Sequence, residues 1–292
     1  MTLLILLSHQ RSGSHFLKQT LNCHNEYLDQ VGYAGTRYIA LPEVLTPGSE
    51  AEYPDQSHWL FGPFLRQRLI SSPLEWGDPG GIANAASLYF HHLRELSDEK
   101  IVLADIKLNQ LFIGEGWYQE PATPPRMLCT LRREGKIILL RRRNLVRAIV
   151  SGIQAKQTGI WHVRNGSSAP CPAKLNINAN EFLNRLVQID RGLAEADEWL
   201  RDWGPATLKV DYEDLYDTGT LACNSQVFSR IAEFAGMATG ITWTTTMRKT
   251  GVYQLCDILE NYEEVQSALQ STKFATMLNE EPTPLSVAAV AA

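Results

Sequence analysis

The sequence predicts an α/β fold with three layers, in which helices flank a central parallel sheet. Three observations carry this prediction. Short runs of consecutive apolar residues recur along the chain, as in strands that are buried on both faces. Longer segments with helical periodicity alternate with these runs. The chain of 292 residues also fits one α/β domain. We expect that domain over residues 1–280, with lid or substrate loops at 32–81 and a flexible tail at 281–292.

The first apolar run, residues 3–7, is followed at once by a polar turn and a helix. Backbone N–H groups at a helix N-terminus have no partner, and the helix dipole favours negative charge there. Arg11 adds a cation, and Ser12 and Ser14 add hydroxyl donors. The turn therefore predicts a phosphate or sulfate site.

This turn differs from the common nucleotide loop G-x-x-x-x-G-K-[ST]. Ser8 stands where the first Gly of that pattern would be, and Ser14 stands where its Lys would be. We therefore describe the turn, and the fold that it opens, as P-loop-like.

Between the first helix and residue 96 the pattern is less regular. We expect residues 22–29 to form a polar bend that carries His24, Glu26 and Asp29. Residues 32–81 predict long loops with short helical pieces near Glu43 and Leu65. Their many aromatic residues fit an ordered lid over a substrate pocket, or equally a plain surface cover. Residues 83–96 predict a helix.

Two further buried strands end in basic residues. Residues 100–107 form one, with Lys107 at its end, and ligands in parallel sheets bind beyond the carboxyl ends of strands. Residues 136–140 form the other, followed by Arg141-Arg142-Arg143-Asn144. Asn144 can cap the next helix, on which Arg147 and Ser151 lie four residues apart. We expect Arg143, Arg147 and Ser151 to form a second anion site.

The rest of the chain continues the alternation. It predicts a helix at 182–200, a strand at 206–210 followed by Asp211-Tyr212-Glu213-Asp214-Leu215, and a helix at 227–234. A Thr-rich basic loop at 242–251 carries Arg248 and Lys249. Residues 255–278 are expected to be helical.

Composition excludes several classes of protein. A formal net charge of −5 argues against nucleic-acid binding. Five scattered cysteines without C-x-x-C spacing indicate reduced thiols in a cytoplasmic protein, and no disulfide framework or zinc site. No apolar run approaches the ~20 residues of a membrane span. Adjacent His91 and His92 lack a third ligand, so no metal site is expected. A homo-oligomer remains compatible with the sequence.

In these motifs the chain resembles the sulfotransferases that use 3′-phosphoadenosine 5′-phosphosulfate (PAPS), and most of all the bacterial carbohydrate and nodulation-factor type, which includes trehalose 2-sulfotransferase-like proteins. Gln10-Arg11-Ser12-Gly13-Ser14 is similar to their 5′-phosphosulfate loop, although His15 stands where the family usually has Thr or Ser. Arg143-Asn144 with Ser151 has the spacing of their 3′-phosphate site. The segments 104–111, 158–162 and 211–215 resemble further stretches, and Arg248-Lys249-Thr250-Gly251 resembles the loop that closes over the 3′-phosphate.

The resemblance implies in-line sulfuryl transfer to a hydroxyl or nitrogen of a small-molecule acceptor, such as a sugar or a natural product. Arg11 and Lys107 would then face the leaving oxygen, while Arg143, Ser151, Arg248 and Lys249 would hold the 3′-phosphate. PAPS would be the co-substrate, and no metal would be required. Some relatives carry a His base where this chain has Asn109. For the general base we therefore expect Asp29 first, Glu26 second, with His24 as a further candidate.

Two other functions stay open on the sequence. One is a nucleotide kinase or another NTPase built on a similar strand, loop and helix, although the missing Lys of the usual loop counts against it. The other is a nucleotide-binding protein without catalysis, which the position of His15 allows.

Overall fold

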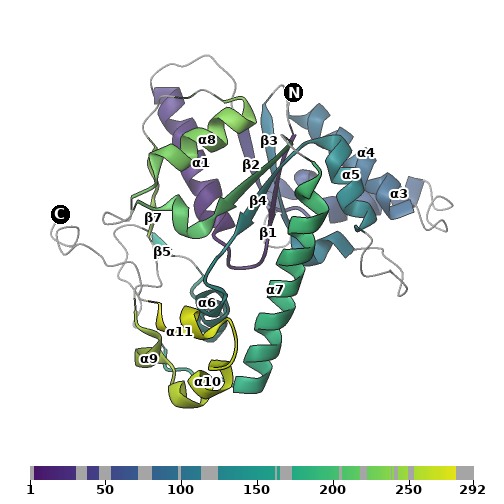
Figure 1. The fold of residues 1–292 in the computed structure, drawn as a ribbon. Coiled ribbons are helices and arrows are strands. Elements are labelled where there is room, and N and C mark those ends of the chain that lie inside the picture. The colour runs from purple at the N-terminus through teal and green to yellow at the C-terminus, as the bar shows by residue number, and fades with distance from the viewer. Residues whose placement is uncertain are drawn as a thin grey trace.

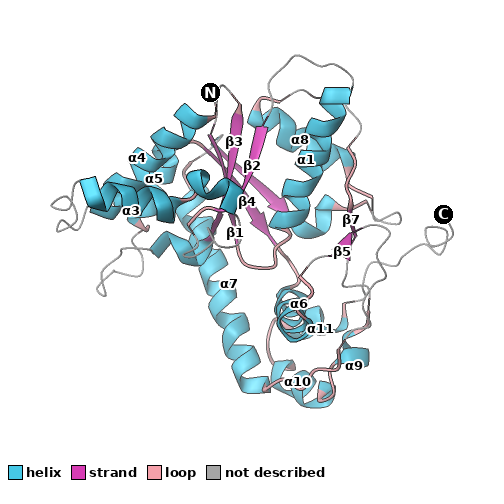
Figure 2. Ribbon diagram, turned by 180° about the vertical axis from the view of Figure 1, so that it is seen from behind, coloured by secondary structure: helices cyan, strands magenta, loops and turns pink. Residues whose placement is uncertain are grey.

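The computed structural model describes residues 3–30, 38–45, 54–71, 81–97, 100–112, 124–161, 163–164, 173–203, 206–217, 222–237, 239, 243–248 and 253–280. Its centre is a five-stranded sheet with helices on both faces (Figures 1 and 2). The strands are β1 (Leu3–Ser8), β2 (Tyr38–Glu43), β3 (Ile101–Lys107), β4 (Lys136–Arg141) and β6 (Thr207–Asp211). All neighbouring pairs are parallel. The predicted three-layer α/β fold is therefore confirmed.

The strand order is β2-β3-β1-β4-β6, which puts β1 in the middle of the sheet. After β1 the chain goes to β2 at one edge, whereas after β4 it goes to β6 at the other edge. The loops that follow β1 and β4 thus leave neighbouring strands in opposite directions. In open parallel sheets this arrangement leaves a crevice at the carboxyl ends of the two strands, where ligands bind.

Alternate residues of each strand face opposite layers of the molecule. On β1, Leu4 and Leu6 pack toward α1 (Ser14–Gln30) and α8 (Ser225–Ala235). Leu3, Ile5 and Leu7 pack toward α4 (Gly81–Leu96) and α5 (Arg126–Glu134). Because both faces are covered, residues 3–7 of the strand are all apolar, which explains the uninterrupted apolar runs in the sequence.

A third cluster of buried residues lies beyond the sheet. It joins α6 (Leu145–Thr158) and the first half of α7 (Ala179–Arg201) to α9 (Leu255–Ile258), α10 (Tyr262–Leu269) and α11 (Ala275–Asn279). Figure 1 shows this group below the sheet, with α7 running between the two parts. The last turns of α7 bury Ala196 and Leu200 in the sheet's own core. The helical group is therefore tied to the sheet through α6 and α7.

Several predicted elements are confirmed and some are wrong. The strands expected at 3–7, 100–107, 136–140 and 206–210 are present, as are the helices at 83–96, 182–200 and 227–234. The polar bend expected at 22–29 is wrong, because α1 continues to Gln30 and keeps Cys23 and Leu28 buried. The helical piece expected near Glu43 is wrong, because that segment is β2. The continuous helix expected at 255–278 is three short ones, α9, α10 and α11.

The described part of residues 32–81 includes a 3₁₀ turn (Pro54–Trp59) and α3 (Phe61–Ser71), which contains Leu65 as expected. The aromatic rings of Phe61 and Phe64 lie 5.1 and 5.5 Å from the ring of Tyr89 on α4. The Tyr89 hydroxyl donates a hydrogen bond of 2.6 Å to the carbonyl oxygen of Trp59. These aromatic residues pack onto the core at α4.

Smaller features complete the described chain. Val163–Arg164 (β5) and Met247–Arg248 (β7) pair as a short antiparallel ribbon.

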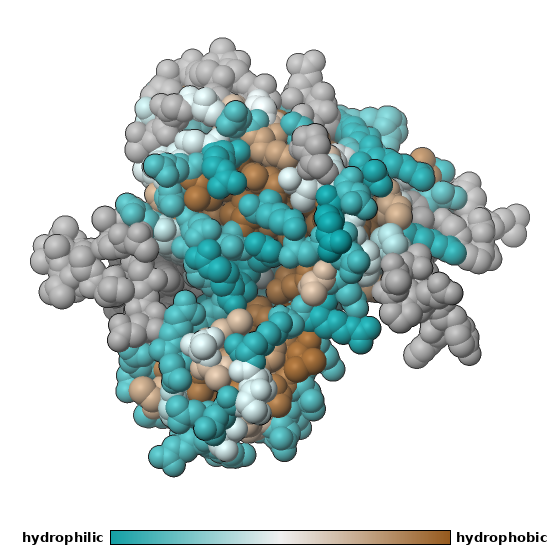
Figure 3. Space-filling view, in the orientation of Figure 1, coloured by the Kyte–Doolittle hydropathy of each residue, from teal (hydrophilic) through white to brown (hydrophobic). Residues whose placement is uncertain are grey.

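Four of the five cysteines are described, and none of these four forms a disulfide. Among the described helices, none is both long and apolar enough to cross a membrane. Hydrophilic residues cover much of the face in Figure 3, with apolar residues in patches between them. The expected tail, residues 281–292, lies outside the described residues.

The packing of α8 onto the sheet gives a first prediction. Phe228 is fully buried, and its ring lies 5.4 Å from the ring of Trp243 and 6.2 Å from that of Phe16. We expect Phe228→Ala to lower the free energy of unfolding by ~3–5 kcal/mol, because it leaves a cavity between α1 and α8. Urea denaturation measures the loss. Val187→Ala, at a position half exposed on α7, should stay within ~0.5 kcal/mol of the wild type. Equal losses would contradict this packing.

Candidate functional site

The loop after β1 is a tight turn in which two residues have left-handed backbone conformations. Arg11 has a φ of 63°, and Gly13 has a φ of 85°. Arg11 is the one non-glycine residue with positive φ in the described chain. Such a conformation costs free energy for a residue with a side chain, and it persists where the surroundings enforce it. The surrounding structure therefore holds the predicted loop in this conformation, and the loop leads directly into α1.

Side-chain contacts on α6 hold the Arg11 guanidinium. Its Nη2 donates to Oγ of Ser151 at 3.0 Å, and its Nη1 donates to the carbonyl oxygen of Trp161 at 3.2 Å. The Trp161 ring lies 5.5 Å from the guanidinium carbon and is half exposed. The structure therefore brings together Arg11 and Ser151, which the sequence assigned to two separate anion sites.

Lys107 reaches the same loop from the end of β3. It is almost fully buried, and its ammonium donates to Oγ of Ser14 at 2.8 Å and to Oγ of Ser8 at 3.2 Å. The carboxylate of Asp105, two residues earlier on the strand, accepts from the same ammonium at 2.8 Å. Lys107 therefore lies against the β1 loop.

Asp105 is a buried carboxylate between two cations. Its Oδ1 pairs with Lys107, and its Oδ2 lies 2.7 Å from Nζ of Lys18, one turn into α1. Burial alone would raise the pKa of Asp105, but the charges of Lys18 and Lys107 outweigh burial, so the pKa lies below its usual value. The carboxylate is therefore charged at neutral pH and holds β3 to α1.

Glu43 stands beside this network at the carboxyl end of β2. A register shift between Ala40 and Glu43 sets it opposite Asp105 on β3, and its Oε1 lies 3.4 Å from Nζ of Lys107. Its side chain is 39% exposed, which leaves it open to a ligand. Glu43 is not among the residues predicted for the site, because its segment was expected to be loop and helix. The apolar run that precedes it is the sequence signal for a strand.

The three consecutive arginines after β4 divide between two sides of the strand. Arg141 pairs with Asp197 and Asp211, and Arg143 pairs with Asp211 and with Asp214 at 2.8 Å. Arg142 points the other way, and its Nη1 donates to the carbonyl oxygen of Arg11 at 3.0 Å. Arg142 is therefore the arginine beside the β1 loop.

Arg147 joins the same side from the first turn of α6. Its two terminal nitrogens donate to the carbonyl oxygens of Tyr253 and Glu280, at 3.0 and 2.9 Å. Asn144 caps this helix as predicted, since its Oδ1 accepts from the N–H of Arg147 at 2.9 Å. The residues around Glu280 thus pack against the N-terminus of α6.

The two groups of arginines differ in their electrostatic surroundings. Within the described chain, Arg11, Arg142 and Arg147 form no ion pair with a carboxylate. Burial, and next the charge of Arg142, lowers the pKa of Arg11 and of Arg147. Burial also acts on Arg143, but the carboxylates of Asp214, Glu213 and Asp211 raise its pKa. In the first group, the nearby Glu280 carboxylate partly offsets the lowering of the pKa of Arg147, but no carboxylate forms an ion pair with these arginines in the described chain.

Other predicted site residues lie elsewhere or outside the described chain. Glu26 and Asp29 are exposed in the last turns of α1, about 18 and 22 Å along the helix axis from Ser14 at 1.5 Å per residue. At that distance neither reaches a group bound at the loop. His24 is buried, with its ring stacked 4.0 Å from the ring of Trp243.

The remaining candidates frame the loop or the short ribbon. Gln10 is exposed, Ser12 is buried, and His15 is partly buried in the first turn of α1. Arg248 ends β7, but its side chain and all of Lys249 lie outside the described residues. In the described part of the chain, no group of three His, Cys, Asp or Glu side chains is arranged to hold a metal ion.

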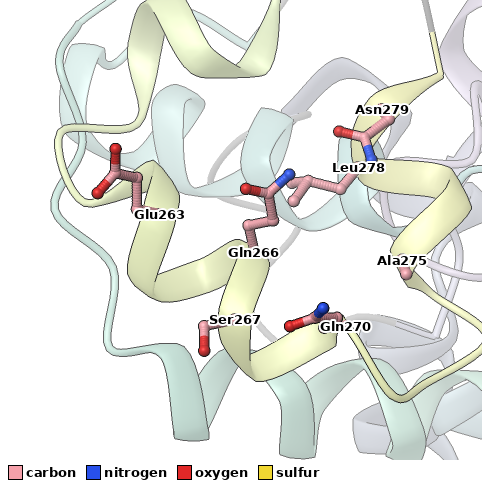
Figure 4. Close-up of a pocket in the computed structure, with 7 residues that line it drawn as sticks. All are labelled: Glu263, Gln266, Ser267, Gln270, Ala275, Leu278 and Asn279. Carbon is pink, nitrogen blue, oxygen red and sulfur yellow. The ribbon is translucent and has the colours of Figure 1, made fainter.

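A surface pocket of about 360 Å³ lies away from this site, between α10 and α11 (Figure 4). Glu263, Gln266 and Gln270 line one side, and Ala275, Leu278 and Asn279 line the other. No strand end contributes to it. Its lining carries one acidic side chain and no basic one, so it offers nothing to an anion.

A comparison with known protein families finds no match to this chain, and a comparison with curated proteins finds none either.

The Asp105 ion pairs give a second prediction. We expect Asp105→Asn to lower the free energy of unfolding by ~3–5 kcal/mol at neutral pH, because it removes the carboxylate that pairs with the buried Lys107 ammonium and with the partly buried Lys18 ammonium. A carboxyl whose folded pKa is lowered adds stability above its unfolded pKa, and this stability is lost as the pH falls through the folded value. The difference from wild type should therefore shrink below about pH 4. Urea unfolding at a series of pH values measures it.

Glu195→Gln is the control for this experiment. It removes one partner of the surface pair with Arg191, so we expect a loss below about 1 kcal/mol. A loss for Asp105→Asn that is independent of pH would contradict the role given to the carboxylate.

Proposed function

We propose that this protein is a PAPS-dependent sulfotransferase that moves a sulfuryl group to a hydroxyl or nitrogen of a small-molecule acceptor. The observation that carries the proposal is the division of positive charge at the crevice between β1 and β4. Lys107 contacts the β1 loop from one side, Arg11 lies within the loop, and Arg142 and Arg147 lie on the other side. A nucleotide with one phosphate group on each of two ribose positions fits two such centres.

In this proposal the β1 loop holds the 5′-phosphosulfate. The N-terminus of α1, the hydroxyls of Ser12 and Ser14, and the Lys107 ammonium face its oxygens. The 3′-phosphate lies toward Arg142, Arg147 and Ser151. Arg143, which the resemblance assigns to that phosphate, is held by Asp211 and Asp214, so we assign Arg142 in its place. The expectations of a cytoplasmic enzyme and of a requirement for no metal stay part of the proposal.

Sulfuryl transfer is an in-line displacement. The acceptor oxygen forms a bond to sulfur while the bond from sulfur to the bridging oxygen of the phosphosulfate breaks, and adenosine 3′,5′-bisphosphate leaves. Catalysis then depends on positioning and on charge stabilisation at the leaving oxygen. Lys107 and Arg11 supply that charge, because the transition state places more negative charge on the bridging oxygen than the substrate does.

The acceptor hydroxyl must lose a proton, and we assign this step to Glu43. Its carboxylate lies 3.4 Å from the Lys107 ammonium and is partly exposed, which in this proposal puts it beside the acceptor. It replaces Asp29 and Glu26, which the length of α1 keeps away. When the proton moves to Glu43, the Glu43 carboxylate loses its negative charge, while Lys107 stays paired with Asp105 and faces the leaving group.

Two other functions fit parts of the site. A nucleotide kinase would also bind at the β1 loop, but Ser14 occupies the position of the lysine that contacts the terminal phosphates in such enzymes. A nucleotide-binding protein without catalysis would use the same cations and would not need Glu43. The next two experiments separate these functions from the proposal.

Ligand-dependent stability distinguishes the bisphosphate site from an ATP site. At one hundred times its Kd, adenosine 3′,5′-bisphosphate should add about 2.7 kcal/mol to the free energy of unfolding. ATP with Mg²⁺ at the same concentration should have little effect, because it carries no 3′-phosphate. Thermal unfolding with each ligand measures the difference. The opposite ranking would overturn the proposal in favour of a kinase or NTPase.

Glu43→Gln tests the general base. With labelled PAPS and a panel of hydroxyl acceptors, we expect kcat to fall by ~10²–10⁴, while the thermal shift from the bisphosphate stays as in wild type. Asp29→Asn is the comparison, since it removes a carboxylate at the far end of α1. A larger loss in Asp29→Asn than in Glu43→Gln would return the base to α1. No product from the wild type with any acceptor, despite tight binding, would favour the non-catalytic function.

A further inference from the structure

The segment after β6 has no part in the site so far, yet one of its residues packs against the β1 loop. Tyr212 begins a 3₁₀ turn (Tyr212–Leu215) directly after β6. A Cβ placed on Gly13 would collide with the Cδ2 and Cε2 atoms of the Tyr212 ring. The ring therefore lies flush on the backbone of the loop, and Gly13 is the residue that allows this approach, both by its positive φ and by its lack of a side chain.

The same ring contacts the guanidinium of Arg142. The guanidinium carbon of Arg142 lies over the ring, 4.7 Å from its centroid, within the range of a cation–π contact. Arg142 in turn donates to the carbonyl oxygen of Arg11, two residues before Gly13. One aromatic ring thus touches the loop after β1 and the arginine turn after β4, which are the two halves of the proposed nucleotide site.

Tyr216, which packs against Phe16, supports the position of the Tyr212 ring. The Tyr212 and Tyr216 hydroxyl oxygens lie 3.4 Å apart, and the Tyr216 ring is stacked 4.2 Å from that of Phe16 on α1. Tyr216 is buried, so the support does not depend on solvent-exposed contacts.

The residues on either side of Tyr212 contact Arg143 and, in the described chain, form no ion pair with Arg142. Asp211 and Asp214 pair with the Arg143 guanidinium, and Glu213 accepts from the backbone N–H groups of Arg143 and Asn144, at 3.0 and 3.2 Å. The two adjacent arginine side chains therefore point to opposite sides of this segment. The Arg143 guanidinium pairs with the carboxylates, and the Arg142 guanidinium lies over the Tyr212 ring.

We infer that Tyr212 is a positioning residue that holds Arg142 beside the β1 loop and so creates the preference for a nucleotide with a 3′-phosphate. This inference rests on the proposed function, because it concerns the same bisphosphate site. Without the ring, the Arg142 guanidinium has no flat surface to lie on, and the loss of the contact is expected to cost roughly tenfold in affinity for a ligand that needs Arg142.

The test compares two probes on the full chain. Isothermal titration calorimetry with adenosine 3′,5′-bisphosphate and with adenosine 5′-monophosphate gives the ratio of their Kd values. In Tyr212→Leu this ratio should fall roughly tenfold relative to wild type, mainly through weaker bisphosphate binding. Tyr212→Phe keeps the ring and should hold the ratio within about twofold. A ratio unchanged in Tyr212→Leu would overturn the inference.

A double-mutant cycle shows whether Tyr212 acts through Arg142. If it does, Tyr212→Leu should weaken bisphosphate binding little further once Arg142→Ala is present, whereas its effect should add to that of Arg143→Ala. Additive losses with Arg142→Ala would overturn the inference, because a general loosening of the fold would give them. If Tyr212→Leu lacks a cooperative unfolding transition, Tyr212→Met fills more of the volume and carries the same measurements.

The two proposals fail in different ways. A wild-type chain with no preference for the bisphosphate would overturn the proposed function, whatever the Tyr212 variants do. A wild-type preference that survives in Tyr212→Leu would overturn only the positioning role.

Discussion

The buried ion pairs of Asp105 are the interaction on which the rest of the site depends. One carboxylate on β3 holds Lys107 from its own strand and Lys18 from α1, so the central strands and the first helix keep one relative position. A charge removed from water is costly unless it is paired, and here both oxygens have a cation. Because Asp105 directs the Lys107 ammonium toward Ser8 and Ser14, the β1 loop is organised before any ligand binds.

A second organising feature is the separation of arginines by their partners. Arg141 and Arg143 are neutralised by carboxylates at the end of β6 and on α7, and such partly exposed pairs contribute modestly to stability. Arg142, Arg11 and Arg147 form no ion pair with a carboxylate among the described residues, although Glu280 lies near Arg147. The same short segment, Asp211 to Asp214, supplies both the carboxylates and the Tyr212 ring. This segment, far from the arginines in the sequence, decides which arginine has a carboxylate partner.

The proposed site uses groups that lie at, or directly after, the carboxyl ends of the parallel strands. Glu43, Lys107 and Ser8 are the last residues of β2, β3 and β1, and Arg142 and Tyr212 directly follow β4 and β6. Parallel strands present these ends on one side. A base, a cation and two phosphate centres can therefore lie close together although they are far apart in the sequence. The length of α1 has the opposite effect, since it carries Glu26 and Asp29 away from that side.

The sequence by itself determined the three-layer fold, four of the five strands in the sheet, the turn after β1 and the Asn144 cap. These depend on apolar runs and on neighbours a few residues apart, which local physics controls. It did not determine β2, because a bulge and Pro42 interrupt the strand pattern there, and with β2 it missed Glu43. Only the tertiary structure decided that Arg142, and not Arg143, lies beside Arg11. The reason is that each arginine takes its direction from partners about seventy residues away, Tyr212 for one and Asp211 and Asp214 for the other.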